Sequence, residues 1–128
     1  MTLVMSKNHG NETLKNLIEK IDFKDVKIMG SIGCKIASII RGESDIYISL
    51  SLTGKSAPKD WDFAAPHALL KAAGGAITNL NNQELIYNNS NFEQRGVIIA
   101  TSNRKSHKEI CSQVKKIIEE FDIYPLKS

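Results

Sequence analysis

The stretch that most constrains this chain is Lys59–Gly75, KDWDFAAPHALLKAAGG. A loop with two acids and a tryptophan runs directly into a helix rich in alanine and leucine, which are strong helix formers. Asp62 stands where an N-cap residue would stand, and Gly74 or Gly75 would supply the left-handed residue that ends the helix. The stretch therefore predicts a loop, a helix and then a short strand that starts at about Ile77.

Three interpretations of Asp62 are open from its position. It can cap the helix, which is the usual role of Asp at an N-cap. It can border an anion site, because the bare N–H groups and the dipole of a helix N-terminus attract phosphate. It can also be a ligand of Mg²⁺, a hard cation that typically takes one or two carboxylates plus substrate phosphate oxygens. Spacing alone favours the cap.

Short apolar runs separated by polar turns predict the strands of a sheet. The run at 97–100 is continuously apolar, which is typical of a strand buried on both faces. Residues 46–52 instead alternate apolar and polar side chains, which predicts a strand with one face on a core. The predicted strands are residues 3–5, 26–29, 46–52, 75–78 and 97–100, with a short strand at 85–87.

Apolar residues at helical spacing predict the helices between these strands. Ile36, Ile39 and Ile40 mark the inward face of one of them, which Gly42 ends. The predicted helices are residues 14–21, residues 35–41, the segment after Asp62, and a closing helix from about Arg104 to Phe121. Because strands and helices alternate, the chain is predicted to be α/β, a layered sandwich whose central mixed sheet is covered by helices.

Length, charge and cysteine use narrow the class of protein. The 128 residues suit a single domain, 1–128. No apolar run approaches the ~20 residues that cross a bilayer, and the N-terminus is not typical of a signal peptide. Two cysteines make no disulfide framework, so we expect a cytoplasmic location. A net charge of +3 suits an anionic small molecule, while the few aromatic residues argue against binding to a nucleic acid polymer.

Two loops carry further candidate residues. In Gly30–Lys35, GSIGCK, the glycines allow a sharp turn into a helix whose N–H groups could meet an anion, with Lys35 close by. This is not a Walker loop, and on its own it favours a plain strand-to-helix turn. Cys34 is predicted to be a small buried residue rather than a nucleophile. His9, in the turn Ser6–His9, is on its own a surface or capping residue.

Taken together, these segments resemble the inositol monophosphatase family of Mg²⁺-dependent phosphatases. Trp61-Asp62-x-Ala64-Ala65, followed by Ala72–Gly75, is similar to the second signature of that family. In the signature, the Asp binds catalytic metal and the small residues let the helix pack closely behind it. The resemblance implies a Mg²⁺ ligand at Asp62, and it implies that the chain is the C-terminal domain of the inositol monophosphatase-like fold.

The loops most resemble the 3′(2′),5′-bisphosphate nucleotidase branch of the family. In that branch a Lys at the place of Lys35 contacts nucleotide phosphate, and a Ser-Arg-Ser-His motif lines the substrate site. Ser6-Lys7-Asn8-His9 keeps the first and last residues of the motif, whereas Asn8 stands in place of its second Ser and lacks the small hydroxyl. The residues that the resemblance places at the substrate are Ser6, His9, Ser31, Gly33, Lys35 and Asp62.

Only the C-terminal half of the family's enzyme is matched. The N-terminal half should bring a Glu pair and an Asp-Pro-Leu/Ile-Asp-Gly-Thr segment that bind metals. No Asp-Pro occurs here, and Glu119-Glu120 lies on the closing helix. The resemblance thus implies a half-site of a Mg²⁺-dependent phosphatase that removes the 3′-phosphate of adenosine 3′,5′-bisphosphate or its sulfated relative. Either a homo-oligomer or a missing N-terminal partner domain is then expected.

Three alternatives stay open. An inositol or sugar monophosphatase is disfavoured, because residues 57–60 lack the Glu that inositol enzymes place before the Trp-Asp pair. A non-catalytic nucleotide-binding module would take up the nucleotide without Mg²⁺ and release no phosphate. One part of a split enzyme would expose an apolar face where the other part packs.

Overall fold

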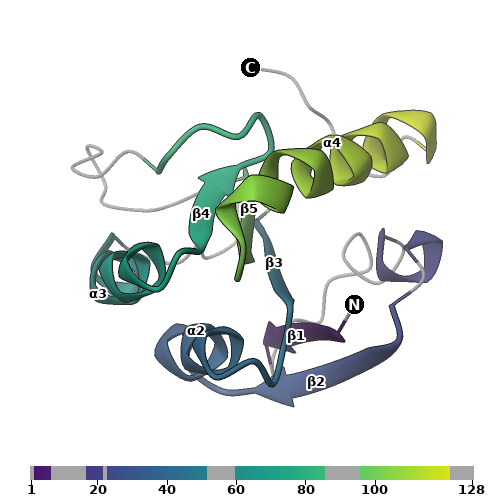
Figure 1. Cartoon of the computed structure of the whole chain (residues 1–128). Helices are drawn as coiled ribbons and strands as arrows, with labels where there is room; N and C mark the ends of the chain where they lie inside the picture. Colours follow the sequence, from purple (N-terminus) through teal and green to yellow (C-terminus); the bar gives the residue numbers. More distant parts are fainter. Residues whose placement is uncertain (1, 7–16, 22, 52–59, 86–95, 122–128) are drawn as a thin grey trace.

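Five strands of the chain form one mixed sheet in a computed structural model, which describes residues 2–6, 17–21, 23–51, 60–85 and 96–121 (Figure 1). The strands lie in the order β2-β1-β3-β5-β4. Strand β1 pairs in parallel with β2 and β3, whereas β5 is antiparallel to both β3 and β4. The strands are β1 (Thr2–Ser6), β2 (Asp25–Met29), β3 (Ile46–Ser51), β4 (Ala76–Asn79) and β5 (Gly96–Thr101).

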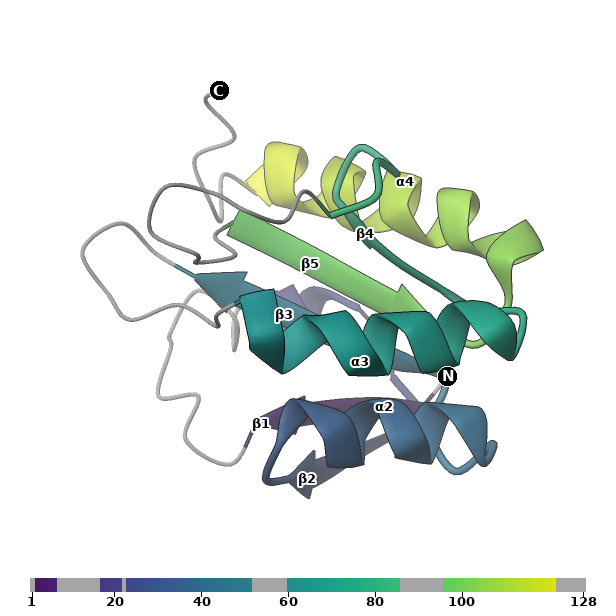
Figure 2. The same ribbon diagram turned by 90° about the vertical axis from the view of Figure 1, so that its left-hand side faces the viewer.

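Helices cover both faces of this sheet (Figures 1 and 2). Helices α2 (Ile32–Ile40) and α3 (Asp60–Ala72) pack side by side on one face. Helix α4 (Arg104–Phe121) and the helical residues 17–20 lie on the other face. The predicted α/β sandwich is therefore confirmed. None of the described helices is long and apolar enough to cross a membrane.

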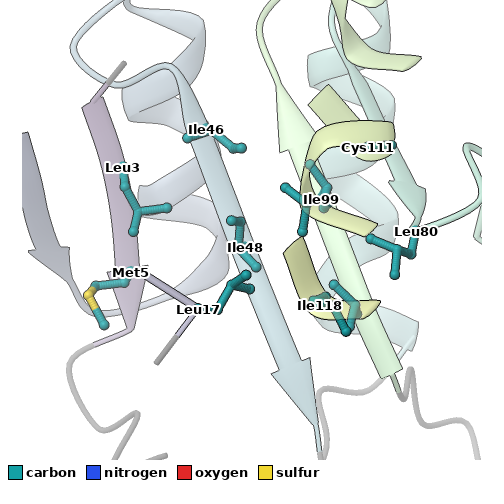
Figure 3. Packing of buried hydrophobic residues seen from close by; sticks show 11 residues of the cluster. Leu3, Met5, Leu17, Ile46, Ile48, Leu80, Ile99, Cys111 and Ile118 are labelled. Atoms are coloured by element: carbon teal, nitrogen blue, oxygen red, sulfur yellow. The ribbon is translucent and has the colours of Figure 1, made fainter. Parts of the chain in front are cut away.

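The core has two parts, one on each side of the sheet. Figure 3 shows the part under α4, a cluster that includes Leu3, Ile48 and Ile99 of the strands and Ile118 of the helix. On the other side, Tyr47 packs among residues of α2 and α3. The prediction that 46–52 has one buried face is wrong, because Tyr47 is also buried, under the α2–α3 layer. The two-sided burial predicted for 97–100 is confirmed.

Helices α2 and α3 end in the same way. Gly74 follows α3 with a φ of 91°, and the N–H groups of Gly74 and Gly75 donate to the carbonyls of Lys71 and Leu70. Gly42 follows α2 with a φ of 79°. Both ends are Schellman motifs, in which a left-handed glycine lets the last carbonyls be satisfied. The predicted stops at Gly42 and at the Gly-Gly pair are confirmed.

Some predicted bounds are wrong. Helix α2 begins at Ile32, earlier than predicted, because the Ser31 hydroxyl accepts a hydrogen bond from the Cys34 N–H at 3.1 Å and caps it. Ile40, predicted to face inward, is the last residue of α2 and is 42% exposed. Of the predicted strand at 85–87, Leu85 is not in a strand and the other residues lie outside the described part, as does the predicted start of helix 14–21.

Candidate functional site

The sequence-predicted residues that the structure describes lie at one edge of the sheet. Strands β1, β2 and β3 are parallel, so their carboxyl ends lie at the same edge. Helices α2 and α3 begin at that edge (Figure 2). We call it the strand-end edge: the end of β1, the turn from β2 to α2, and the first turn of α3. In open α/β sheets, ligands bind outside the carboxyl ends of the strands.

The N-terminus of α2 supplies oriented backbone donors at the strand-end edge. Ser31 is its N-cap, and the Lys35 N–H donates to the Ser31 carbonyl at 3.1 Å. Gly33 is exposed, and a Cβ added there would have only the Ser31 hydroxyl within 4 Å, at 3.8 Å. No acidic residue stands in the first turn of α2. The positive end of the helix dipole is therefore uncompensated and suits an anion.

Lys35 lies deeper than predicted. Its side chain is only 2% exposed, and its ammonium donates to the Gly30 carbonyl at 3.0 Å while lying 5.2 Å from the centre of the Tyr47 ring. Burial lowers the pKa of Lys35, and the charge of Cys34 offsets part of that effect. Among the described residues, no carboxylate forms an ion pair with it. Lys35 thus holds the Gly30 turn from inside, at the base of the α2 N-terminus.

The other predicted residues are placed only by their backbone, or not at all. Asp62 is not the N-cap, because α3 already begins at Asp60 and Asp62 lies within its first turn. Ser6 is the last residue of β1. The side chains of both lie outside the described part of the structure, and so does all of His9. The strand-end edge therefore unites Ser6, Ser31, Gly33 and Asp62 as positions in the fold.

Cys34 is a second correction at this edge. It was predicted to be buried, but its side chain is exposed. The reason is helical phase: with α2 starting at Ile32, the inward face of the helix contains Lys35, Ile36, Ser38 and Ile39, and Cys34 falls outside that face.

Metal binding needs a cluster of donors that the described residues do not form by themselves. No group of three or more His, Cys, Asp or Glu side chains within the described ranges could hold a metal ion. Asp62 stays the predicted metal ligand, and its position in the first turn of α3 suits that prediction, since a single carboxylate is a normal share of a Mg²⁺ site.

A buried polar cluster at the far side of the sheet was missed by the sequence analysis. His107 of α4 is 1% exposed, and its Nε2 and Nδ1 lie 2.6 Å and 2.7 Å from the hydroxyl oxygens of Thr78 and Thr101. The Thr78 hydroxyl donates to the Asn79 carbonyl at 2.8 Å, so it must accept from Nε2–H. The Thr101 hydroxyl lies 2.7 Å from Nδ1 and 3.4 Å from the Asn103 carbonyl, so in a neutral ring with Nε2–H it donates along the shorter contact, to Nδ1. Burial lowers the pKa of His107, which keeps the ring neutral.

This cluster joins β4, β5 and α4 rather than serving the strand-end edge. Thr101 ends β5, and His107 lies in the first part of α4. The only sequence signal is the i, i+4 spacing of His107 and Cys111, which places both on one face of α4. Cys111 lies 3.5 Å from the Thr78 hydroxyl, which completes the cluster.

Comparison with known proteins shows the family. The model of the inositol monophosphatase family matches residues 2–119, and the chain belongs to that family. A solved inositol monophosphatase from Thermotoga maritima aligns with a TM-score of 0.67 and 21% identity. The aligned region is 93% of this chain and 42% of the Thermotoga chain. The inositol monophosphatase from Anabaena (Nostoc) sp. PCC 7120 aligns with a TM-score of 0.63 and 20% identity. The aligned region is 90% of this chain and 43% of the Anabaena chain. These structures share the fold.

Relatives by sequence include 3′(2′),5′-bisphosphate nucleotidases. That of Buchnera aphidicola is 41% identical over 85 residues, which is 66% of this chain and 30% of the relative. That of Mus musculus is 28% identical over 103 residues, which is 79% of this chain and 32% of the relative. The chain therefore spans about a third of the length of these relatives. The predicted resemblance to the family is confirmed.

Proposed function

We propose that this chain forms the C-terminal half-site of a Mg²⁺-dependent phosphatase that removes the 3′-phosphate of adenosine 3′,5′-bisphosphate or its sulfated relative. The observation that carries the proposal is the strand-end edge, where the capped N-terminus of α2 and the first turn of α3 meet the end of β1. The names of the matching nucleotidases support the substrate class, and the free cysteines support a cytoplasmic setting.

In this proposal the α2 N-terminus receives a substrate phosphate. The N–H groups near Gly33 face the anion, and no side chain at that residue obstructs its approach. Lys35 keeps the Gly30 turn in place and adds positive charge behind it. The low-dielectric surroundings of Lys35 strengthen the attraction between its ammonium group and the phosphate. Ser6, the last residue of β1, and His9 would contact the nucleotide.

Asp62 is the residue of this chain that would hold metal. Bound Mg²⁺ would neutralise charge on the scissile phosphate and on the attacking and leaving oxygens. Asp62 lies in the first turn of α3, which begins at the same edge as α2, so a metal held by Asp62 and the α2 N-terminus would act on the same phosphate (Figure 2). The remaining carboxylates would come from an N-terminal segment that the relatives' greater length accommodates.

The test is phosphate release from adenosine 3′,5′-bisphosphate, with Mg²⁺ present and with Mg²⁺ chelated. The 128-residue chain alone should bind the nucleotide by calorimetry and release no phosphate. Addition of the part of the Buchnera relative outside the matched region should restore Mg²⁺-dependent release. Release by the chain alone would contradict the half-site. Binding without any restored release would identify a non-catalytic nucleotide-binding module, and faster hydrolysis of inositol phosphates would move the chain to that branch.

Asp62→Asn should lower the restored turnover by more than about 100-fold, since even partners that only support metal ligands typically cost 10–100-fold. The matched control is Glu109→Gln, on an exposed position of α4 away from the strand-end edge. It should keep full turnover. Near-normal turnover of Asp62→Asn would contradict the metal role of Asp62.

A further inference from the structure

Lys35 and Tyr47 form a buried link between the middle of the sheet and the N-terminus of α2. Lys35 is 2% exposed and Tyr47 is 3% exposed. The Lys35 ammonium lies 5.2 Å from the centre of the Tyr47 ring and donates to the Gly30 carbonyl at 3.0 Å. Within the described part of the structure, no carboxylate pairs with this ammonium. The aromatic ring and the Gly30 carbonyl are therefore the contacts that fix the position of its charge.

The ring of Tyr47 is a firm support because β3 is an interior strand of the sheet. The backbone of Tyr47 lies opposite Val4 of β1 on one side and opposite Ala100 of β5 on the other. Its side chain belongs to the core cluster that also contains residues of α2 and α3. A cation over an aromatic face is attracted more strongly when it is shielded from water. Tyr47 thus holds the Lys35 ammonium in one place.

The bond from Lys35 to Gly30 sets the direction of a backbone donor. The Gly30 carbonyl and the Ser31 N–H belong to one planar trans peptide, so they point in opposite directions. Because the carbonyl points to the buried ammonium, the Ser31 N–H points away from it, and Ser31 is exposed. The Lys35 N–H bonds to the Ser31 carbonyl at 3.1 Å, which directs the Ile32 N–H in the same way. Lys35 therefore orients two backbone donors at the strand-end edge.

We propose, on the basis of the proposed function, that Tyr47 and Lys35 are positioning residues for the phosphate site. Tyr47 holds the ammonium of Lys35, and the ammonium holds the Gly30 carbonyl. The N–H groups of Ser31 and Ile32 are thereby aimed at the substrate phosphate. The resemblance implies direct contact between Lys35 and phosphate, but burial leaves that side chain almost no surface for it. Lys35 thus attracts the anion from behind the backbone donors that bind it.

Calorimetry with adenosine 3′,5′-bisphosphate tests whether Tyr47 acts through Lys35. Tyr47→Leu removes the ring and should weaken binding by roughly five- to thirtyfold in Kd, the range that a shielded cation–aromatic contact supplies. Tyr47→Phe keeps the ring and should bind within about twofold of wild type. In a chain that already carries Lys35→Met, Tyr47→Leu should have no further effect on Kd. An equal loss in both backgrounds, or a loss in Tyr47→Phe as large as in Tyr47→Leu, would overturn the proposal.

Leu70→Ala is the matched control for a loss of core packing. Leu70 is buried, belongs to the same core cluster as Tyr47, and lies near the end of α3, away from the strand-end edge. It should lower stability and leave Kd within about twofold of wild type. A loss of affinity equal to that of Tyr47→Leu would overturn the proposal. If Tyr47→Leu does not fold, trifluorophenylalanine at position 47 keeps the ring but weakens the negative charge of its face, and affinity equal to that of Tyr47→Phe would overturn the proposal.

Nuclear magnetic resonance of the ligand-free chain separates this inference from the proposed function. Tyr47→Leu should further lower the pKa of Lys35, which burial already lowers, because the ammonium loses the attraction of the ring. It should also move the amide signal of Ser31, as Lys35→Met does, whereas Tyr47→Phe should leave both unchanged. A wild-type chain that binds no nucleotide would contradict the proposed function. Unchanged Lys35 and Ser31 signals in Tyr47→Leu would instead overturn the link from Tyr47 to Ser31.

Discussion

At the scale of single residues, two buried basic side chains are held by different means. His107 has a hydroxyl at each ring nitrogen and is neutral, so its burial leaves no polar atom unmatched. Lys35 has one backbone acceptor and the face of Tyr47. A cation over an aromatic ring is attracted by about 0.5–2 kcal/mol, which offsets only part of the cost of its dehydration. His107 therefore contributes to the stability of the fold, whereas Lys35 places a positive charge behind the strand-end edge.

The neutral state of His107 predicts a pH dependence of stability. Burial lowers the pKa of His107 below its ordinary value of about 6.5, so the unfolded chain binds more protons just below pH 6.5. The contribution of His107 is complete above pH 6.5 and is lost as pH falls toward the folded-state pKa. His107→Gln should cost about 1–3 kcal/mol at pH 7.5, and this difference from wild type should shrink by pH 5.

Urea unfolding at a series of pH values measures this difference. The pKa of His67 is also lowered, mainly by burial. Because His67 is present in the wild type and in the His107→Gln variant, its effect cancels in the comparison. A difference in unfolding free energy that stays constant from pH 7.5 to pH 5 would contradict the assignment.

The residues of the candidate site were predicted by motif, but their directions were not. Ser31 and Gly33 lie where an anion site would need them. Lys35 is buried and Cys34 exposed, the reverse of the usual preference. The inversion follows from where α2 begins: with a start at Ile32, Cys34 is part of the helix, and the 100° turn per residue places it off the face that contains Lys35 and Ile36. That start depends on the Ser31 cap, which a pattern of apolar residues does not reveal.

At the scale of elements, the junction of α3 and β4 depends on one glycine. A Cβ on Gly75 would lie 2.4 Å from the Thr101 carbonyl oxygen and 2.6 Å from Cδ1 of Leu70. Both distances are far below van der Waals contact. The absence of a side chain at Gly75 lets α3 turn directly into β4 beside the end of β5.

Gly75→Ala should therefore destabilise the protein by about 1–3 kcal/mol, as overpacking a core does, or by more because one neighbour is backbone. Gly30→Ala is the control, since a Cβ there would meet no atom within 4 Å. It should change the unfolding free energy by less than about 0.5 kcal/mol. Chemical denaturation of both variants gives the comparison, and equal stabilities would show that the α3–β4 junction can relax.

Most elements were predictable because their signals are local. Residues close together in the sequence indicate the glycines that end α2 and α3, the apolar run of β5 and the start of α4 at Arg104. The second buried face of β3 was not predictable. Tyr47 is covered by helices that follow and precede it in the chain, and periodicity within 46–52 carries no information about them.

At the scale of the whole molecule, the three-layer arrangement predicts that both faces of β5 matter equally. Ile98 packs on the α2–α3 side and is 1% exposed, whereas Ile99 packs on the α4 side and is 0% exposed. Ile98→Ala and Ile99→Ala should each cost about 2–5 kcal/mol. Leu69→Ala, at a position 63% exposed, should cost less than about 1 kcal/mol.

Thermal or urea unfolding of the three variants measures these costs. A marked asymmetry, with one of the two isoleucines tolerant of alanine, would mean that one helical layer packs loosely and that the sheet behaves as a two-layer structure.

The sandwich class was predictable from alternation, whereas the strand order was not. Nothing in 96–101 indicates that β5 would lie between β3 and β4, or that it would run antiparallel to both. That placement depends on contacts between residues far apart in the sequence. The predicted split of the active site between this chain and another segment is likewise a property of the whole molecule and stays a prediction.

The interior place of β5 has a consequence for how the chain is made. As the polypeptide leaves the ribosome, β3 and β4 emerge before the strand that separates them, and among the strands that the structure describes β4 pairs with β5 alone. Until residue 101 has emerged, the edge of β3 that β5 will cover stays open. Completion of the sheet thus waits for β5, and a nascent chain that stalls before β5 would leave that edge of β3 without its neighbouring strand.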